Sequence, residues 1–195
     1  MNVNLFRLLN DLAGRYDWID DFMEFCAQDI VWIMLAVMAL LWLSGKTANQ
    51  KLVFYSGLSA AVALIVASFL LSPGINHPRP FVGHTVHQLI PHAPDPSFPS
   101  DHATLAFSLA FGVWFANRRL LGAHLFLLAL LTGVARVYVG VHYPADILGA
   151  MVLSLITCFA IAKMNRRMDA APMLFIRLYR KLTNKLSLAF LPRSK

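Results

Sequence analysis

The segment ARVYVGVHYPADILGA places a histidine and an aspartate where they could act together in catalysis. Pro144 suits the first turn of a helix, so His142 is expected just before that helix and Asp146 in its opening turns. A carboxylate that bonds one imidazole N–H leaves the other nitrogen free to attack and stabilises the cation that develops. The spacing therefore predicts a histidine nucleophile oriented by an aspartate. Taken alone, it also fits an ordinary helix N-terminus with a favourable aspartate.

A second segment, FPSDHATLAF, has the residues of an anion site. An extended stretch ends at Ser100 and an apolar run begins just after His102, so Ser100 is expected to cap the N-terminus of a helix. The free N–H groups and the positive dipole end of such a helix favour anions. His102 would stand in the first turn beside them. The alternative is an ordinary capped helix with an interfacial histidine.

Two arginines complete the set of residues that could bind phosphate. Arg79 lies between two prolines in HPRPF, which stiffen the backbone around it, and Arg136 lies six residues before His142. A guanidinium presents a planar fork of donors that matches phosphate oxygens. Either arginine alone could simply place positive charge near lipid head groups. All of these residues occur in two segments, which favours a phosphate site over separate roles.

The elements that must position these residues are expected to be membrane helices. The chain is 58% hydrophobic and only 14% charged, with a mean hydropathy of +0.60, whereas soluble domains carry about a quarter charged residues. Five apolar segments could cross a bilayer, which takes roughly 20 helical residues each. They cover about residues 30–45, 52–72, 103–116, 120–137 and 146–163. The sequence predicts an all-α, polytopic transmembrane bundle that forms a single domain over residues 1–195.

The two ends of the chain have different patterns. Residues 1–28 mix leucines and aromatic residues with acids and amides, which suits one or two amphipathic helices in the membrane interface. Residues 164–195 form a basic tail, and nine of the seventeen basic residues fall at or after Lys163. A basic segment beside a span is typical of the cytoplasmic side and of anionic lipid, and no nucleic-acid recognition motif accompanies it. We expect no nucleic-acid partner.

Basic residues in the short connections predict the orientation. Lys46 and Lys51 occupy one connection, and Arg118 and Arg119 occupy another, so both are expected on the cytoplasmic side with the tail. The lysine-free segments 73–102 and 136–145 then share the outer face. These two segments hold almost all of the residues described above, so residues 73–102 are predicted to be an outer catalytic loop.

Five of the seven histidines lie in that loop, together with seven prolines. A metal-binding membrane protein is one rival interpretation, but the spacings of these histidines match no compact ligand set, and a metal site would leave the arginines unused. We therefore expect no metal and no cofactor. A non-catalytic scaffold of the same fold is a second rival, although all three proposed reacting groups are present.

Three motifs occur in order along the chain: RP, then PSDH, then an arginine followed after five residues by a histidine and after three more by an aspartate. This order resembles the pattern of the type-two phosphatidic acid phosphatase superfamily. Within it, RPFVGHTVHQLIPHA and SFPSDH are similar to the bacitracin-resistance type of bacterial undecaprenyl-diphosphate phosphatases. The similarity covers roughly residues 70–165. It implies that Arg79 and Arg136 bind phosphate oxygens with Ser100 and the amides of Asp101 and His102.

The resemblance further implies the catalytic roles. His142 attacks phosphorus, His102 protonates the leaving group, and Asp146 orients His142. Three positions depart from the superfamily pattern: Ser72 stands where a lysine is expected, Asp101 replaces a glycine, and Ala135 replaces a serine. The missing lysine removes a fixed positive charge that would stabilise the transition state.

Two hypotheses follow from these departures. His84 or His87, if protonated, could take the place of the missing lysine. The side chain of Asp101 is expected to point away from bound phosphate or to bond an arginine.

The function implied by the resemblance is hydrolysis of undecaprenyl diphosphate to undecaprenyl phosphate on the outer face of the bacterial cytoplasmic membrane. This reaction would recycle the cell-wall lipid carrier and protect against bacitracin. The alternative is a phosphatase of another lipid phosphate, such as phosphatidic acid or phosphatidylglycerol phosphate. The residues by themselves indicate only a phosphate substrate attached to an apolar group.

Overall fold

The computed structural model describes residues 2–164 and 169–190, and every regular element in this part of the chain is helical, so the all-α prediction is confirmed. The elements are α1 (Asn2–Asn10), α2 (Asp17–Gln28), α3 (Ile30–Leu43), α4 (Thr47–Val66), the π-helical η1 (Ala67–Leu71), α5 (Ser72–Ile75), α6 (Pro80–Gly83), α7 (Asp101–Phe115), α8 (Arg119–Tyr138), α9 (Pro144–Met164) and α10 (Ala170–Phe190). All five segments expected to span the membrane are helices, within a few residues of the predicted bounds.

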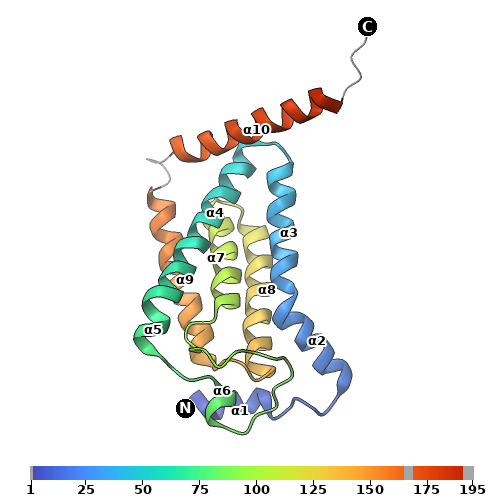
Figure 1. Cartoon of the computed structure of the whole chain (residues 1–195), viewed down its shortest axis with the longest axis vertical. Coiled ribbons are helices and arrows are strands. Elements are labelled where there is room, and N and C mark those ends of the chain that lie inside the picture. Colours follow the sequence, from blue (N-terminus) through green and yellow to red (C-terminus); the bar gives the residue numbers. More distant parts are fainter. Residues whose placement is uncertain (1, 165–168, 191–195) are drawn as a thin grey trace.

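Helix α7 is the centre of the bundle and packs against α4, α8 and α9 (Figure 1). Small residues let these helices approach closely. A Cβ on Gly112 of α7 would lie 2.8 Å from the Cα of Ser56 in α4. Between α7 and α9, Ser108 donates a hydrogen bond to Ser154 at 3.1 Å. Close backbone approach and short polar contacts are how helices associate where lipid removes the hydrophobic driving force.

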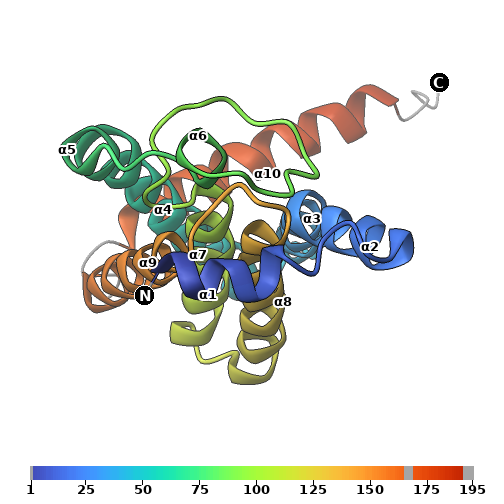
Figure 2. The ribbon, with the colours of Figure 1, turned by 90° about the horizontal axis from the view of Figure 1, so that it is seen from below.

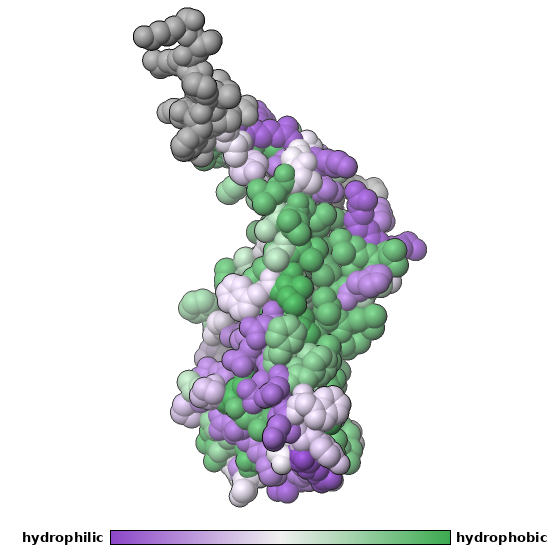
Figure 3. Space-filling model, turned by 90° about the vertical axis from the view of Figure 1, so that its right-hand side faces the viewer, coloured by the Kyte–Doolittle hydropathy of each residue, from purple (hydrophilic) through white to green (hydrophobic). Residues whose placement is uncertain are grey.

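The surface of the bundle suits a bilayer, because an apolar band separates two polar ends (Figure 3). By length and composition, three described helical stretches could cross a membrane: Thr47–Gly83, Arg119–Tyr138 and Pro144–Met164. A fourth span arises if α2 and α3, which meet at 44°, are counted together. Helix α7, with 15 residues, is only about 22 Å long, short of a 30 Å hydrocarbon core. The chain is a multi-pass membrane protein.

The connections divide between the two ends as the basic residues predicted. The α3–α4 and α7–α8 connections lie at the end that α10 covers, while α1, α6 and the α8–α9 connection lie at the other end (Figures 1 and 2). Residues 84–100 form a long connection without regular structure at this second end, whereas residues 73–75 and 80–83 of the expected outer loop belong to the short helices α5 and α6.

Helix α10 was not anticipated within the basic tail. Its apolar residues Leu174, Leu178 and Leu182 recur every four positions, so they fall on one face, and basic residues such as Arg177 and Lys181 separate them. The high charge of the tail concealed this pattern. Residues 165–168 and 191–195 of the tail lie outside the described part of the chain.

Candidate active site

His142 and Asp146 are buried together at the end of the bundle away from α10, with 2% and 1% of their side chains exposed. Helix α9 begins at Pro144, so His142 precedes it and Asp146 lies in its first turn, as predicted. The His142 Nδ1 lies 3.4 Å from the Asp146 Oδ2. Asp146 therefore faces one ring nitrogen and leaves Nε2 directed elsewhere, which is the arrangement that a histidine nucleophile requires.

Ser97 is a member of this cluster that sequence reasoning missed. Its hydroxyl donates a short hydrogen bond to the Asp146 Oδ2 and lies 3.4 Å from the His142 Nδ1. The backbone N–H of Tyr143 donates to the same carboxylate oxygen at 2.8 Å. Two donors besides His142 thus fix the Asp146 carboxylate, and Ser97 comes from the long loop rather than from α9. The sequence carried no signal for Ser97 beyond its place three residues before Ser100.

Arg79 reaches the other side of the His142 ring. Its Nη1 lies 3.2 Å from the His142 Nε2 and donates to the carbonyl oxygen of Val141 at 3.1 Å. Its Nε donates to Asp95 at 2.8 Å, and the Arg79 side chain is 5% exposed. The guanidinium is held at both ends, directly beside the nitrogen that would attack. A phosphate at this position would accept hydrogen bonds from Arg79 while it faces His142.

Arg136 is buried without a partner for much of its guanidinium. Only 2% of the residue is exposed, and its Nε and Nη2 have no hydrogen-bond acceptor among the described residues. Its carbonyl oxygen accepts from the backbone N–H groups of Val141 and His142, both at 3.3 Å, so the backbone of Arg136 is bonded directly to that of the histidine. Buried charged donors are costly unless they are paired. An anion that binds beside His142 would satisfy them.

Ser100 caps α7 as predicted, because its Oγ accepts from the backbone N–H of Ala103. Among the described residues, the N–H groups of Asp101 and His102 have no backbone acceptor, so both remain available to an anion. The side chain of Asp101 is exposed and makes no hydrogen bond or ion pair with an arginine there. His102 is half-buried, and the charges of Arg136 and Arg79 act on its ring.

His84 and His87 lie beside residues other than His142, and the His84 ring is 6.4 Å from that of Tyr143. Both are exposed, and the described contacts join neither ring to His142. The ring of His87 lies against the α1–α2 turn, where a Cβ on Gly14 would be 3.4 Å from its Nδ1. His92 is the loop histidine that reaches the site, with its ring 6.2 Å from that of His142.

His92 does not supply the positive charge of the missing lysine. Burial, together with the charges of Arg79 and Arg136, lowers the pKa of His92, so its ring is neutral at pH 7. Its Nδ1 lies 3.1 Å from the carbonyl oxygen of Ala93. For Asp95, burial opposes ionisation, but the hydrogen bond and charge of Arg79 outweigh it and lower the pKa of Asp95. Asp95 is therefore an anion that holds Arg79.

The long loop is fastened to the bundle at His87 by Asn10 and by a close approach to Gly140. Asn10 of α1, which is 1% exposed, donates to the carbonyl oxygens of His87 and Tyr138 at 2.7 and 2.8 Å. Its own Oδ1 accepts from the backbone N–H of His87 at 3.0 Å. Gly140 has a φ of +84°, and a Cβ there would lie 2.6 Å from the His87 carbonyl oxygen. Only glycine allows this close approach without strain.

Burial also sets the protonation state of His142, which lies in the α8–α9 connection. Burial and the charge of Arg136 lower the pKa of His142 to about 3, although the hydrogen bond with Asp146 opposes this shift. The imidazole is neutral at pH 7 and keeps a lone pair on Nε2.

Within the described residues, no three His, Cys, Asp or Glu side chains are grouped as metal ligands. The loop histidines lie apart, because His87 is beside Gly14 whereas His92 is beside His142.

A neutral buried histidine, a carboxylate behind it and two arginines in front can transfer a phosphoryl group, and the helices around them lie in a membrane. Fold and site together define a membrane-embedded phosphatase. Residues 52–169 match the family model described as the PAP2 superfamily, and the chain belongs to this superfamily.

Curated relatives agree with this assignment. The chain is 36% identical over 96% of its length, and 96% of the relative's, to the undecaprenyl-diphosphatase BcrC of Bacillus subtilis. It is also 36% identical to the putative undecaprenyl-diphosphatase YbjG of Escherichia coli, over 82% of this chain and 80% of that protein. The crystal structure of LpxE from Aquifex aeolicus has a TM-score of 0.66 at 27% identity, with 83% of this chain and 94% of that chain covered.

Proposed function

We propose that this protein hydrolyses undecaprenyl diphosphate to undecaprenyl phosphate and inorganic phosphate through a phosphohistidine at His142. The observation that carries the phosphatase chemistry is the buried Arg136 guanidinium, unpaired beside a neutral His142. The substrate rests on two relatives named as undecaprenyl-diphosphatases, one of which aligns with nearly the whole chain.

The first step transfers the terminal phosphoryl group. The His142 Nε2 attacks the terminal phosphorus, and the bond from that phosphorus to the bridging oxygen breaks. Arg79 and Arg136 hold the phosphoryl oxygens, where they offset the negative charge of the transition state. His102 donates a proton to the departing oxygen of undecaprenyl phosphate. Asp146 stabilises the positive charge that forms on the imidazole of His142.

The second step regenerates the enzyme. Water gives a proton to His102 and attacks the phosphorus of phosphohistidine, and the nitrogen–phosphorus bond breaks to release inorganic phosphate. Ser100 and the amides of Asp101 and His102 bind the phosphate oxygens in both steps. All of these groups belong to the protein, so the proposed reaction needs no metal.

The place of His102 also indicates where the lipid tail lies. The group that protonates the leaving oxygen must touch it, and that oxygen belongs to the phosphate that carries the tail. His102 lines a groove of about 190 Å³ that is mostly apolar and lies between α3, α4 and α7. The apolar members of the groove are Val31, Trp32, Leu35, Leu64 and Leu105. The isoprenoid chain can therefore pass from the site into the bilayer along this groove.

We further propose that the site faces the outside of the bacterial cytoplasmic membrane. The basic connections and α10 lie at the opposite end of the bundle, and basic segments remain on the cytoplasmic side. On that outer face the enzyme would return the lipid carrier to cell-wall synthesis. It would also remove the diphosphate that bacitracin binds, which would give resistance.

Phosphate release from undecaprenyl diphosphate by detergent-purified protein tests the proposal. The His142→Ala variant should lose several powers of ten in rate, since a covalent catalyst is removed. His124→Ala is a matched control, because His124 is exposed near the other end of α8. Activity should survive EDTA.

A labelling experiment tests the intermediate. Substrate labelled with ³²P at the terminal phosphate should transfer the label to wild-type protein in an alkali-stable, acid-labile form, and no label should attach to His142→Ala. Full activity of His142→Ala, or loss of wild-type activity in EDTA, would overturn the mechanism. Activity only on other lipid phosphates would overturn the substrate assignment.

A further inference from the structure

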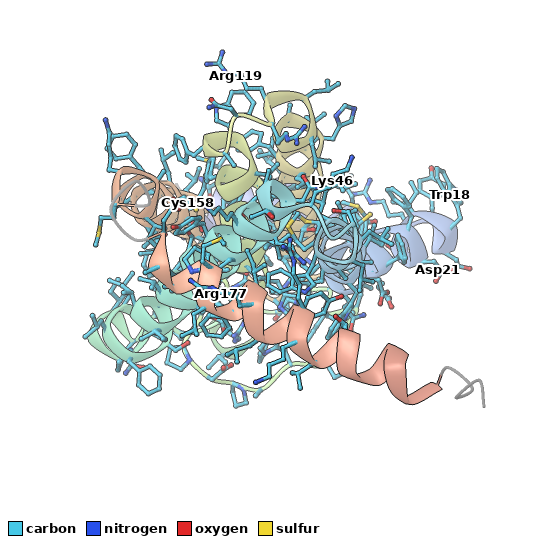
Figure 4. All side chains as sticks on the ribbon, turned by 90° about the horizontal axis from the view of Figure 1, so that it is seen from above. Trp18, Asp21, Lys46, Arg119, Cys158 and Arg177 are labelled. Atoms are coloured by element: carbon cyan, nitrogen blue, oxygen red, sulfur yellow. The ribbon has the colours of Figure 1, made fainter. Side chains whose placement is uncertain are left out.

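The end of the bundle opposite the candidate active site has a pocket of about 520 Å³ with a polar lining. It lies between the α3–α4 connection and the start of α8. Its polar lining consists of Lys46, Arg118 and Arg119 with the amides of Asn49 and Asn117, and contains no carboxylate. Figure 4 looks onto this end and shows Lys46 and Arg119 on the same side of α10. The pocket is therefore strongly positive.

The three basic side chains that line the pocket are not paired with acidic side chains. Among the described residues, the ion pair at this end joins Lys51 to Asp169 at 3.0 Å, and none of the pocket cations has a carboxylate within 4.0 Å. Arg118 instead donates to the Asn49 Oδ1 at 3.4 Å. Like charges held close together repel one another, so a bound anion would stabilise the pocket.

The start of two long helices adds to this positive potential. Helix α4 begins at Thr47 and α8 at Arg119, and the side chains of their N-cap residues, Lys46 and Arg118, make no capping hydrogen bond. The first N–H groups of both helices, which begin beside the pocket, therefore receive no acceptor from their N-cap side chains. These helix ends reinforce the attraction of an anion that the three side chains establish.

The remaining walls of the pocket are apolar and reach the lipid-facing surface. They consist of Leu41, Leu52, Leu120 and Leu121. Leu120 is 76% exposed at the end of the bundle, whereas Leu52 is 6% exposed and forms the inner wall. A soluble anion would gain nothing from contact with these leucine side chains. A phospholipid carries a phosphate next to apolar chains, and basic pockets between membrane helices bind such head groups.

We propose that this pocket binds the phosphate head group of an anionic phospholipid in the leaflet opposite the active site. Lys46, Arg118 and Arg119 contact the phosphate, and the acyl chains lie along the leucines. The site is separate from the hydrolytic site, so the bound lipid is not a substrate. The inference is independent of the proposed substrate, because it concerns the other end of the protein.

Titration of the detergent-purified protein with dioctanoyl phosphatidylglycerol, followed by native mass spectrometry, tests the proposal. Wild-type protein should bind one molecule with higher affinity than any further ones, and should bind dioctanoyl phosphatidylcholine much more weakly. The double variant Lys46→Gln/Arg119→Gln should weaken the first binding on the order of 30-fold. It should keep its phosphatase activity, which shows that it is folded.

The matched control removes two charges at the same end but outside the pocket. Lys163 and Arg177 are both exposed and do not line the pocket, so Lys163→Gln/Arg177→Gln should bind like wild type. An equal loss in this control would show general surface attraction and overturn the proposal. So would unchanged binding in Lys46→Gln/Arg119→Gln. Displacement of the lipid by millimolar inorganic phosphate would show a site for free anions instead of lipid.

Discussion

Replacement of Asp146 by asparagine tests the core of the proposed chemistry. The Asp146 Oδ2 accepts from Ser97 and from the Tyr143 N–H, and it lies 3.4 Å from the His142 Nδ1. Asparagine nearly preserves the shape of the side chain but removes the negative charge. It can also turn its NH₂ group toward His142, which favours the tautomer with the proton on Nε2. Both changes weaken the nucleophile.

The size of the effect follows from the distance. Two unit charges 3.4 Å apart interact by about 5 kcal/mol at an effective dielectric constant of about 20. The transition state gains this attraction as His142 becomes positive, whereas the free enzyme, with a neutral ring, does not. Asp146→Asn should therefore lower kcat on the order of 10³ to 10⁴-fold. KM should change little, because Asp146 does not face the phosphate.

Phosphate release at several substrate concentrations separates kcat from KM for this variant. Asp21→Asn serves as the control, since Asp21 is exposed on α2 and lies outside the His142 cluster. It should retain wild-type rates. A kcat for Asp146→Asn within tenfold of wild type would refute the electrostatic role of Asp146, provided that the variant is folded by circular dichroism.

Three further outcomes are expected. Ser97→Ala should lower kcat about 10- to 100-fold with little change in KM, because it removes a hydrogen bond to the Asp146 carboxylate. Burial lowers the pKa of His142 to about 3, so below pH 6.5 the unfolded chain takes up a proton on this residue that the native chain does not. At pH 5 this difference should lower the free energy of unfolding by about 2 kcal/mol. This should appear as a melting temperature that falls with pH in wild type and falls less in His142→Gln. Gly140→Ala should lower the melting temperature, because a φ of +84° costs other residues about 1–2 kcal/mol and the new Cβ would meet the His87 carbonyl at 2.6 Å.

Each of these outcomes has a control. Ser108 is a buried serine that bonds within the bundle, so Ser108→Ala should leave KM and kcat nearly unchanged, and a loss equal to that of Ser97→Ala would point to general packing. Gly45 has a φ of +68°, but a Cβ added there would meet no atom within 4 Å, so Gly45→Ala should lower the melting temperature less than Gly140→Ala. Equal pH dependence in wild type and His142→Gln would contradict the shifted pKa.

The parts of the site that follow a local helix rule could be predicted from the sequence. Helix α9 begins at Pro144, so His142 and Asp146, which are four residues apart in the sequence, lie on either side of the helix start. Ser100 likewise marks the start of α7. Long apolar runs located the spans, since a membrane helix must be apolar around most of its surface. These features depend on neighbours in the sequence.

The parts that were missed depend on contacts between distant segments. Ser97 and His92 come to His142 only because the loop folds back over the bundle, and nothing in the spacing of five loop histidines distinguishes His92 from His87. Asn10 is 77 residues from its partner His87. An amphipathic pattern carries no signal for a buried asparagine, yet this side chain is buried and bonded to the loop.

The hydrogen bonds of Asn10 show that residues outside the catalytic part of the chain help to hold the loop over the site. The family match begins at residue 52, so every proposed reacting group lies inside it, while Asn10, one of the side chains that hold the loop, lies outside it. A protease cut near Gly14, or a bulky fusion at the amino terminus, would leave the reacting groups intact but could break the bonds between Asn10 and the loop. Exchanging α1 between relatives would accordingly offer a way to tune how firmly the loop closes, and hence turnover, without altering a catalytic side chain.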